Sequence, residues 1–254
     1  MNEASEFVLE RFTDESENKI LFPNHLICIG VTMSGKSSLI GSILDRIHKV
    51  YNFKNISNTD KLLIIISPIS SLEITQFMTT SLSWNILLFQ SKHFDAKLMA
   101  EIKLLFEASK CGIKILLVDD FLIRISNCSK SISLLNEAFS YYRHLGVSIF
   151  STMHCYDGNY QTILQNSGLV LVMYGLGTVT FLRNLLQVHF HRGTAHIVRM
   201  LKTCFLNEMR LHDYICVNQT KEAMAGELFY ITNTCFDPDK FPKFIVKLKK
   251  ILFY

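Results

Sequence analysis

Short apolar runs alternate with amphipathic stretches along most of this chain, and this alternation predicts its elements of secondary structure. Six apolar runs predict buried strands, over residues 25–29, 62–67, 84–89, 113–118, 147–153 and 169–174. Apolar residues at helical spacing predict helices, over residues 36–50, 96–109 and 132–144 and from residue 176 to about residue 200. A terminal strand pair is predicted at residues 214–217 and 228–231. This order is typical of an α/β domain with a mainly parallel sheet flanked by helices.

The predicted helix over residues 132–144 carries its own stop signal. Its apolar positions are 132, 135, 139 and 142, which lie on one helical face. Arg143 and His144 place basic side chains in the last turn, where they complement the helix dipole. Gly146 follows directly and favours the left-handed turn that ends many helices.

The segment between the first strand and the first helix has the sequence of a phosphate-binding loop. It reads Gly30-Val31-Thr32-Met33-Ser34-Gly35-Lys36-Ser37 and matches GxxxxGK[ST], with the flanking strand and helix that a chance turn would lack. Its glycines let backbone N–H groups turn towards a phosphate, and the helix N-terminus adds a favourable dipole. We therefore expect ATP and Mg²⁺ here, with Lys36 at the β and γ phosphates and Ser37 on the cation. The predicted nucleotide-binding residues are Gly30, Val31, Thr32, Met33, Ser34, Gly35, Lys36, Ser37 and Ser38.

Two adjacent carboxylates follow the apolar run at residues 113–118. They are Asp119 and Asp120, and in a parallel sheet the end of their strand falls at the same edge as the loop. Asp119 is predicted to hold Mg²⁺, directly or through water, and Asp120 to accept a proton from an attacking water. The alternative is a strand that leaves the sheet through an acidic turn.

A histidine follows the next apolar run. His154 comes directly after residues 147–153, so we expect it at the same edge of the sheet. There it can hydrogen-bond to the γ phosphate or the attacking water and report which nucleotide is bound. A surface histidine at a strand end is the alternative.

Composition excludes several classes of protein. With 49% apolar and 19% charged residues the chain is not largely disordered. The longest apolar stretch, residues 168–182, falls short of the roughly 20 residues that cross a bilayer, so we expect no membrane span. The seven cysteines include no CxxC pair and indicate neither a disulfide framework nor a zinc site. The first residues lack a secretory signal, and we expect an intracellular protein.

Charge is distributed unevenly along the chain. Residues 1–17 hold six acids and one arginine, whereas the remainder holds 25 bases and 16 acids. The sequence therefore predicts an acidic N-terminal arm over residues 1–21 and a basic ATPase domain over residues 22–254. The basic excess is compatible with a polyanionic partner such as nucleic acid. Five lysines at residues 240–250 form a basic tail, which either contacts a partner or packs with its lysines in solvent.

These pieces resemble, in their order, the viral genome-packaging ATPases of the FtsK–HerA superfamily, of the poxvirus and Polinton type. The resemblance covers about residues 22–237, and its carriers are the loop with residues 27–29 before it, residues 118–121 (VDDF), residues 142–148 (YRHLGVS) and residues 160–172 (YQTILQNSGLVLV). It implies an oligomeric ring that hydrolyses ATP to move double-stranded DNA of any sequence into a capsid. It also implies capsid proteins as partners and an infected host cell, in its nucleus or a cytoplasmic virus factory, or the virion as the location.

The chain departs from the family pattern at three places. Met33 stands where a glycine is usual and should crowd the mouth of the site, and His154 stands where glutamine or asparagine is usual. Residues 175–179 (GLGTV) replace a Pro-Arg-Asp turn. Ring ATPases of this kind insert an arginine from a neighbouring subunit. In this chain Arg143, of the ArgHis pair, or Arg183 could take that role. The alternative for each is an arginine at a helix end or on the surface with no catalytic role.

Two other functions stay open at this point. The same loop serves nucleoside and nucleotide kinases, but these need an arginine-rich lid, and no such cluster follows the third strand. A nucleotide-dependent scaffold that binds ATP and barely hydrolyses it is also compatible with Met33, His154 and the missing arginine turn.

Overall fold

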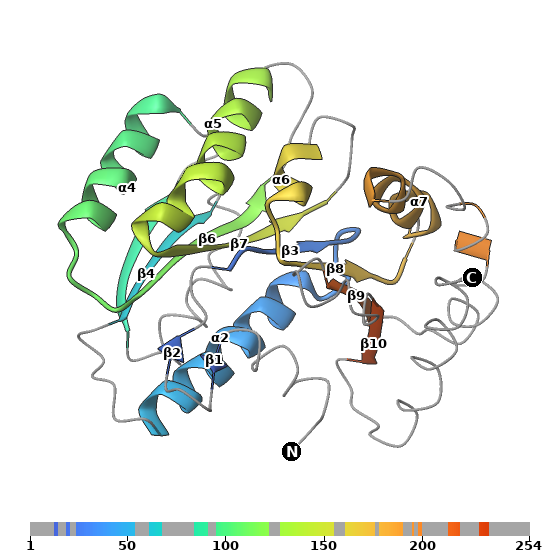
Figure 1. Ribbon diagram of the computed structural model, residues 1–254, viewed down its shortest axis with the longest axis horizontal. Coiled ribbons are helices and arrows are strands. Elements are labelled where there is room, and N and C mark those ends of the chain that lie inside the picture. The colour runs from blue at the N-terminus through green and yellow to red at the C-terminus, as the bar shows by residue number, and fades with distance from the viewer. Residues whose placement is uncertain are drawn as a thin grey trace.

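The computed structural model places a large α/β domain along most of the chain (Figure 1). It describes residues 13–14, 19–20, 24–53, 61–67, 84–90, 95–121, 128–154, 161–175, 178–189, 195, 198–199, 213–218 and 229–233. The predicted basic tail at residues 240–250 and most of the predicted acidic arm lie outside these residues. Within the arm, the structure describes a short antiparallel pair, β1 (Thr13–Asp14) and β2 (Lys19–Ile20).

An eight-stranded sheet forms the centre of the domain. Its strand order is β10-β9-β8-β3-β7-β6-β4-β5. The six strands from β8 to β5 pair in parallel, and β9 and β10 add an antiparallel pair beside β8. The strands are β3 (Leu26–Ile29), β4 (Lys61–Ser67), β5 (Asn85–Gln90), β6 (Ile113–Phe121), β7 (Val147–Met153), β8 (Leu169–Met173), β9 (Asp213–Asn218) and β10 (Phe229–Asn233). The predicted fold class is confirmed.

Helices cover both faces of the sheet. They are α2 (Lys36–Phe53), α4 (Ala96–Ala108), α5 (Cys128–Tyr141), α6 (Gln161–Gln165) and α7 (Thr178–His189). Figure 1 shows α4, α5 and α6 over one face and α2 on the opposite face. Among the described residues, no helix has the length and apolar character needed to span a membrane.

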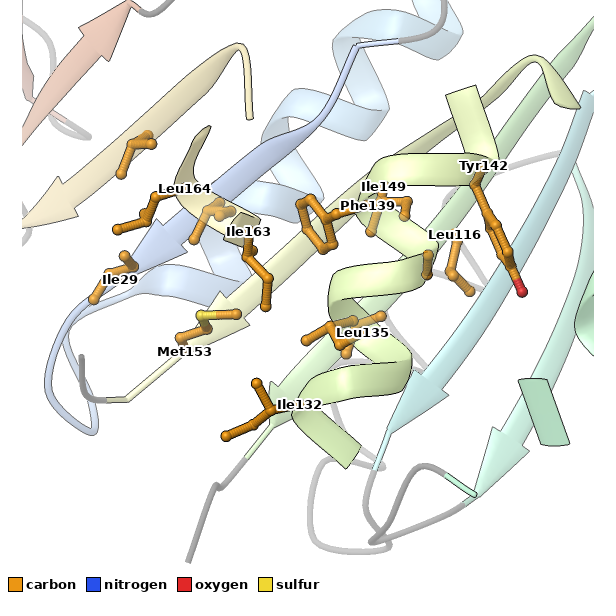
Figure 2. Close-up of a cluster of buried hydrophobic side chains, with 14 of the residues drawn as sticks. Ile29, Leu116, Ile132, Leu135, Phe139, Tyr142, Ile149, Met153, Ile163 and Leu164 are labelled. Carbon is orange, nitrogen blue, oxygen red and sulfur yellow. The ribbon is translucent and has the colours of Figure 1, made fainter. Parts of the chain in front are cut away.

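Two hydrophobic clusters lie on the two sides of the sheet, which explains why the central strands are largely apolar on both faces. On β3, Ile27 and Ile29 pack in the cluster under α4, α5, α6 and α7, whereas Leu26 and Cys28 pack in the cluster with α2. Successive side chains of a strand point to opposite faces, so a strand covered on both faces buries all of them. Figure 2 shows the first cluster, in which Phe139 of α5 lies beside Ile149 of β7 and Leu135 follows one turn away on the same helix.

The predicted end of the helix over residues 132–144, which corresponds to α5, is confirmed in its main features. Ile132, Leu135, Phe139 and Tyr142 are all buried, as the spacing requires. The last turn tightens into a 3-10 helix, η3 (Tyr142–Leu145), and Gly146 ends it with a left-handed backbone at φ 71°.

The structure differs from the sequence prediction at several elements. β6 runs on to Phe121, so Asp119 and Asp120 lie inside the last residues of the strand and not beyond it. The five-residue helix α6 was not predicted, because so short a segment shows no clear periodicity. The helix predicted from residue 176 begins at Thr178 and continues to His189, and part of the stretch up to residue 200 lies outside the described residues.

Candidate nucleotide-binding site

The predicted loop lies at the carboxyl edge of the parallel sheet, between β3 and α2. The N–H of Gly30 donates to the carbonyl of Met153 at the end of β7, at 3.1 Å, which ties the loop to the neighbouring strand. The N–H of Ser34 then donates to the carbonyl of Val31 at 3.2 Å, which closes a tight turn. The backbone has positive φ at Met33 (62°) and at Gly35 (91°), and this reversal lets a loop curl around a phosphate.

Met33 is in an unusual conformation at the tip of this loop. A residue with a Cβ pays a steric cost of roughly 1–2 kcal/mol in the left-handed region. Its side chain is 87% exposed and makes the loop tip apolar. The expectation that Met33 crowds the mouth of the site stays a prediction.

Lys36 is folded into the loop. Its side chain is only 5% exposed, and Nζ donates to the carbonyl oxygen of Val31 at 2.9 Å. The same nitrogen lies 3.4 Å from Nδ1 of His154, which also lies 3.3 Å from the hydroxyl oxygen of Thr32. The structure therefore brings His154 to the loop, as its place after β7 led us to expect.

The acidic end of β6 meets the first turn of α2. Ser37 donates a hydrogen bond of 3.0 Å to Oδ1 of Asp119, across 82 positions of sequence. Asp119 is 2% exposed, and its Oδ1 accepts a second hydrogen bond of 2.9 Å from Thr152 of β7. The structure thus brings together Ser37 and Asp119, the two predicted ligands of Mg²⁺.

Thr152 was not among the site residues predicted from the sequence. A signal was present, because Thr152 precedes His154 by two positions and residues two apart on a strand point to the same face. A threonine inside a buried apolar strand carries a hydroxyl that needs a partner. The adjacent acids were the obvious candidates for that partner.

The residues present fit a magnesium ion held together with a phosphate. Mg²⁺ prefers oxygen ligands and usually takes one or two from the protein, with water and phosphate supplying the rest. Ser37 and Asp119 offer such oxygens side by side. Within the described ranges, no group of three or more histidine, cysteine or acidic side chains forms a metal cage. Ser37 and Asp119 would hold the cation, which the bound phosphates would share.

Cys28 lies beneath this site and is chemically quiet. Burial is the main cause that raises the pKa of its thiol to about 12, while the charge of Lys36 opposes the shift and that of Asp119 adds to it. A thiol in this state stays protonated and is a poor nucleophile. We therefore assign Cys28 to packing in the strand and not to chemistry.

The turn after β8 also lies against the loop. A Cβ added at Gly175 would lie 3.1 Å from Cγ2 of Val31, so the backbone of Gly175 lies close to the Val31 side chain. The Thr178 hydroxyl accepts from the N–H of Gly175 at 2.9 Å, which holds this turn at the start of α7. Gly175, the first residue of the segment that replaces the family's arginine turn, therefore lies against the loop.

Other predicted residues are not gathered here. Arg143 lies in η3, just before β7 begins, whereas the site forms where β7 ends. Asn166, within residues 160–172 of the resemblance, lies at the edge where β8 begins. Its amide donates to the Ser140 hydroxyl and the Thr162 carbonyl, which is a structural role between α5 and α6. The backbone of Asp120 lies in β6, but its side chain lies outside the described part of the structure.

Comparison with known proteins gives a likeness of fold. No protein-family model and no curated protein sequence matches this chain. The DNA-packaging ATPase B204 from Sulfolobus turreted icosahedral virus matches with a TM-score of 0.56 and 16% identity, over 82% of this chain and 96% of that one. The genome-packaging NTPase B204 from Sulfolobus turreted icosahedral virus 2, in complex with AMP, matches over the same shares with a TM-score of 0.55 and 13% identity. The fold is that of a P-loop ATPase.

A P-loop ATPase fold places its phosphate-binding loop and its acidic strand at one sheet edge, which is where this chain has Lys36 and Asp119. At identities of 13% and 16%, these two matches show the fold alone. The activity has to be argued from the site. The narrower poxvirus or Polinton type stays a prediction.

Proposed function

We propose that this chain is an ATPase that drives double-stranded viral DNA into a capsid as part of an oligomeric ring. The observation that carries the hydrolytic part is the 3.0 Å hydrogen bond from Ser37 to Asp119. It joins the helix after the loop to the acidic strand, and these are the two elements from which a P-loop NTPase holds its cation.

Lys36 and the loop bind the triphosphate in this proposal. The ammonium group of Lys36 exchanges the neutral carbonyl of Val31 for phosphate oxygens, because an ionic partner forms the stronger hydrogen bond. Bound Mg²⁺ supplies neutralisation of the charge that develops on the β and γ phosphates. Ser37 and Asp119 would hold the cation at the mouth of the loop.

His154 and Asp120 act on the water side of the reaction. His154 lies beside Thr32 and Lys36, so it can hydrogen-bond to the γ phosphate or to the attacking water. Asp120 accepts the proton of that water. Because His154 follows β7 directly, a change in its hydrogen bonding on hydrolysis passes into the segment after the strand.

DNA packaging is supported by the likeness in fold to two viral packaging ATPases and by the basic excess of residues 18–254. Arg143 lies at the opposite edge of the sheet from its own loop, so it would serve as the arginine finger of a neighbouring subunit in the ring. We propose capsid proteins as the other partners and the infected host cell as the place of action.

ATP turnover of the purified protein, with and without double-stranded DNA, tests this function. We expect DNA-stimulated hydrolysis, and Lys36→Ala should lower turnover at least about a hundredfold while leaving the fold intact. Lys97→Ala, an exposed lysine of α4, is the matched control and should behave as wild type. Absence of turnover in both conditions would contradict the proposal. Tight ATP binding without hydrolysis in the assembled oligomer would select a scaffold, and phosphorylation of a nucleoside would select a kinase.

A further inference from the structure

We infer that Thr152 is a positioning residue for the magnesium site, because its hydroxyl holds the Asp119 carboxylate in the orientation in which that carboxylate binds the cation. The direct observation is the 2.9 Å hydrogen bond from Thr152 Oγ1 to Asp119 Oδ1. This inference rests on the proposed function and adds a residue that neither the loop motif nor the acidic pair includes.

Thr152 occupies a rigid place in the fold. It is 0% exposed and lies in β7, which is paired in parallel with β3 on one side and β6 on the other. Its register partner on β3 is Cys28, directly under the phosphate-binding loop. A hydroxyl fixed by two neighbouring strands is a better anchor than one on a loop, since its position changes little when a ligand binds.

The pairing of β6 with β7 is irregular at this point. Val118 pairs with Ser151 and Phe121 pairs with Met153, so two residues of β6 stand where β7 has only Thr152. The two are Asp119 and Asp120. An extra residue of this kind bends a strand and re-aims a side chain, and such irregularities are common next to active sites. The hydrogen bond from Thr152 secures the Asp119 carboxylate where the regular ladder is interrupted.

Two hydroxyl groups converge on one carboxylate oxygen. Ser37 and Thr152 both donate to Oδ1 of Asp119, from α2 and from β7. Ser37 is also the proposed cation ligand, so its oxygen must serve the metal as well. Thr152 has no such second task in the proposed chemistry, and its bond can persist in the empty and the loaded site. Partners of metal ligands typically change metal affinity or activity by 10- to 100-fold when they are removed.

Binding of a fluorescent ATP analogue, measured in EDTA and across a Mg²⁺ titration, separates this role from a structural one. Thr152→Val keeps the shape of the side chain and removes the hydroxyl, and Thr152→Ser keeps the hydroxyl. Ser151→Ala is the matched control, because Ser151 is a buried hydroxyl on the same strand that finds no hydrogen-bond partner among the described residues. ATP turnover across the same titration gives a second reading.

We expect Thr152→Val to bind the analogue in EDTA as wild type does and to need about 10- to 100-fold more Mg²⁺ for half-maximal effect. Thr152→Ser should restore the wild-type requirement, and Ser151→Ala should not change it. A folded valine variant with the wild-type Mg²⁺ requirement, or one that loses binding in EDTA as well, overturns the inference. Should the valine variant not fold, Thr152→Ala is compared in the same way. Wild-type protein that binds no nucleotide overturns the proposed function itself.

Discussion

Nδ1 of His154 lies 3.4 Å from the ammonium nitrogen of Lys36. An ammonium group carries donors only, so a hydrogen bond between the two requires Nδ1 of a neutral ring as the acceptor, with the ring proton on Nε2. His154 and Lys36 thus lie together beside the loop, where we expect the γ phosphate to bind.

His154→Ala should lower the rate of ATP hydrolysis about a hundredfold and leave the affinity for ADP nearly unchanged. The physical reason is that the ring contacts the groups that face the γ phosphate, which ADP lacks. Steady-state turnover and ADP titration measure the two quantities. His154→Gln retains a polar side chain and should lose less of the rate. An alanine variant with wild-type turnover would show that His154 has no part in the reaction.

The free energy of unfolding should fall as the pH is lowered from about 6.5 to about 4 and then level off, through His25. This side chain is 2% exposed, and burial lowers its pKa to about 4, with the charge of Arg143 adding to the shift and the Phe139 backbone opposing it. In this interval the unfolded chain takes up a proton that the folded protein does not, so acid favours unfolding. The difference is on the order of 3 kcal/mol.

Urea denaturation at several pH values measures this effect. The ring accepts a 3.0 Å hydrogen bond from the N–H of Ile149 through Nδ1. His25→Gln offers a side-chain oxygen to that donor but takes up no proton, so its stability should depend less steeply on pH. Identical slopes for the two proteins would assign the acid sensitivity to other groups.

Gly30→Ala should destabilise the protein by about 1–3 kcal/mol and impair nucleotide binding. The added Cβ would lie 2.6 Å from Cβ of Met173 and 2.7 Å from the hydroxyl oxygen of Ser34, so the end of β8 or the loop must move. Gly112→Ala is the control, because an added Cβ there meets nothing within 4 Å. The midpoint of urea unfolding compares the two variants. Equal midpoints would mean that the loop accommodates the methyl group without strain.

Much of the fold was predictable from local pattern. The strands and helices followed from apolar periodicity, since strands covered on both faces are largely apolar and helices keep one apolar stripe. Gly146 marked the end of a helix because only a left-handed residue closes it well. The loop around Lys36 was predictable for the same reason, because its eight residues are contiguous and its chemistry depends on their own backbone.

The contacts that complete the site could not be predicted from any short stretch of the chain. Thr152 reaches Asp119 across 33 positions, through an interruption in the pairing of β6 with β7 that no periodicity reveals. The parallel order of the strands likewise puts Arg143 at the sheet edge opposite its own loop, although it stands near His154 in the sequence. Residues far apart in the sequence come into contact only when the strands pair. The folded sheet therefore decides which side chains meet.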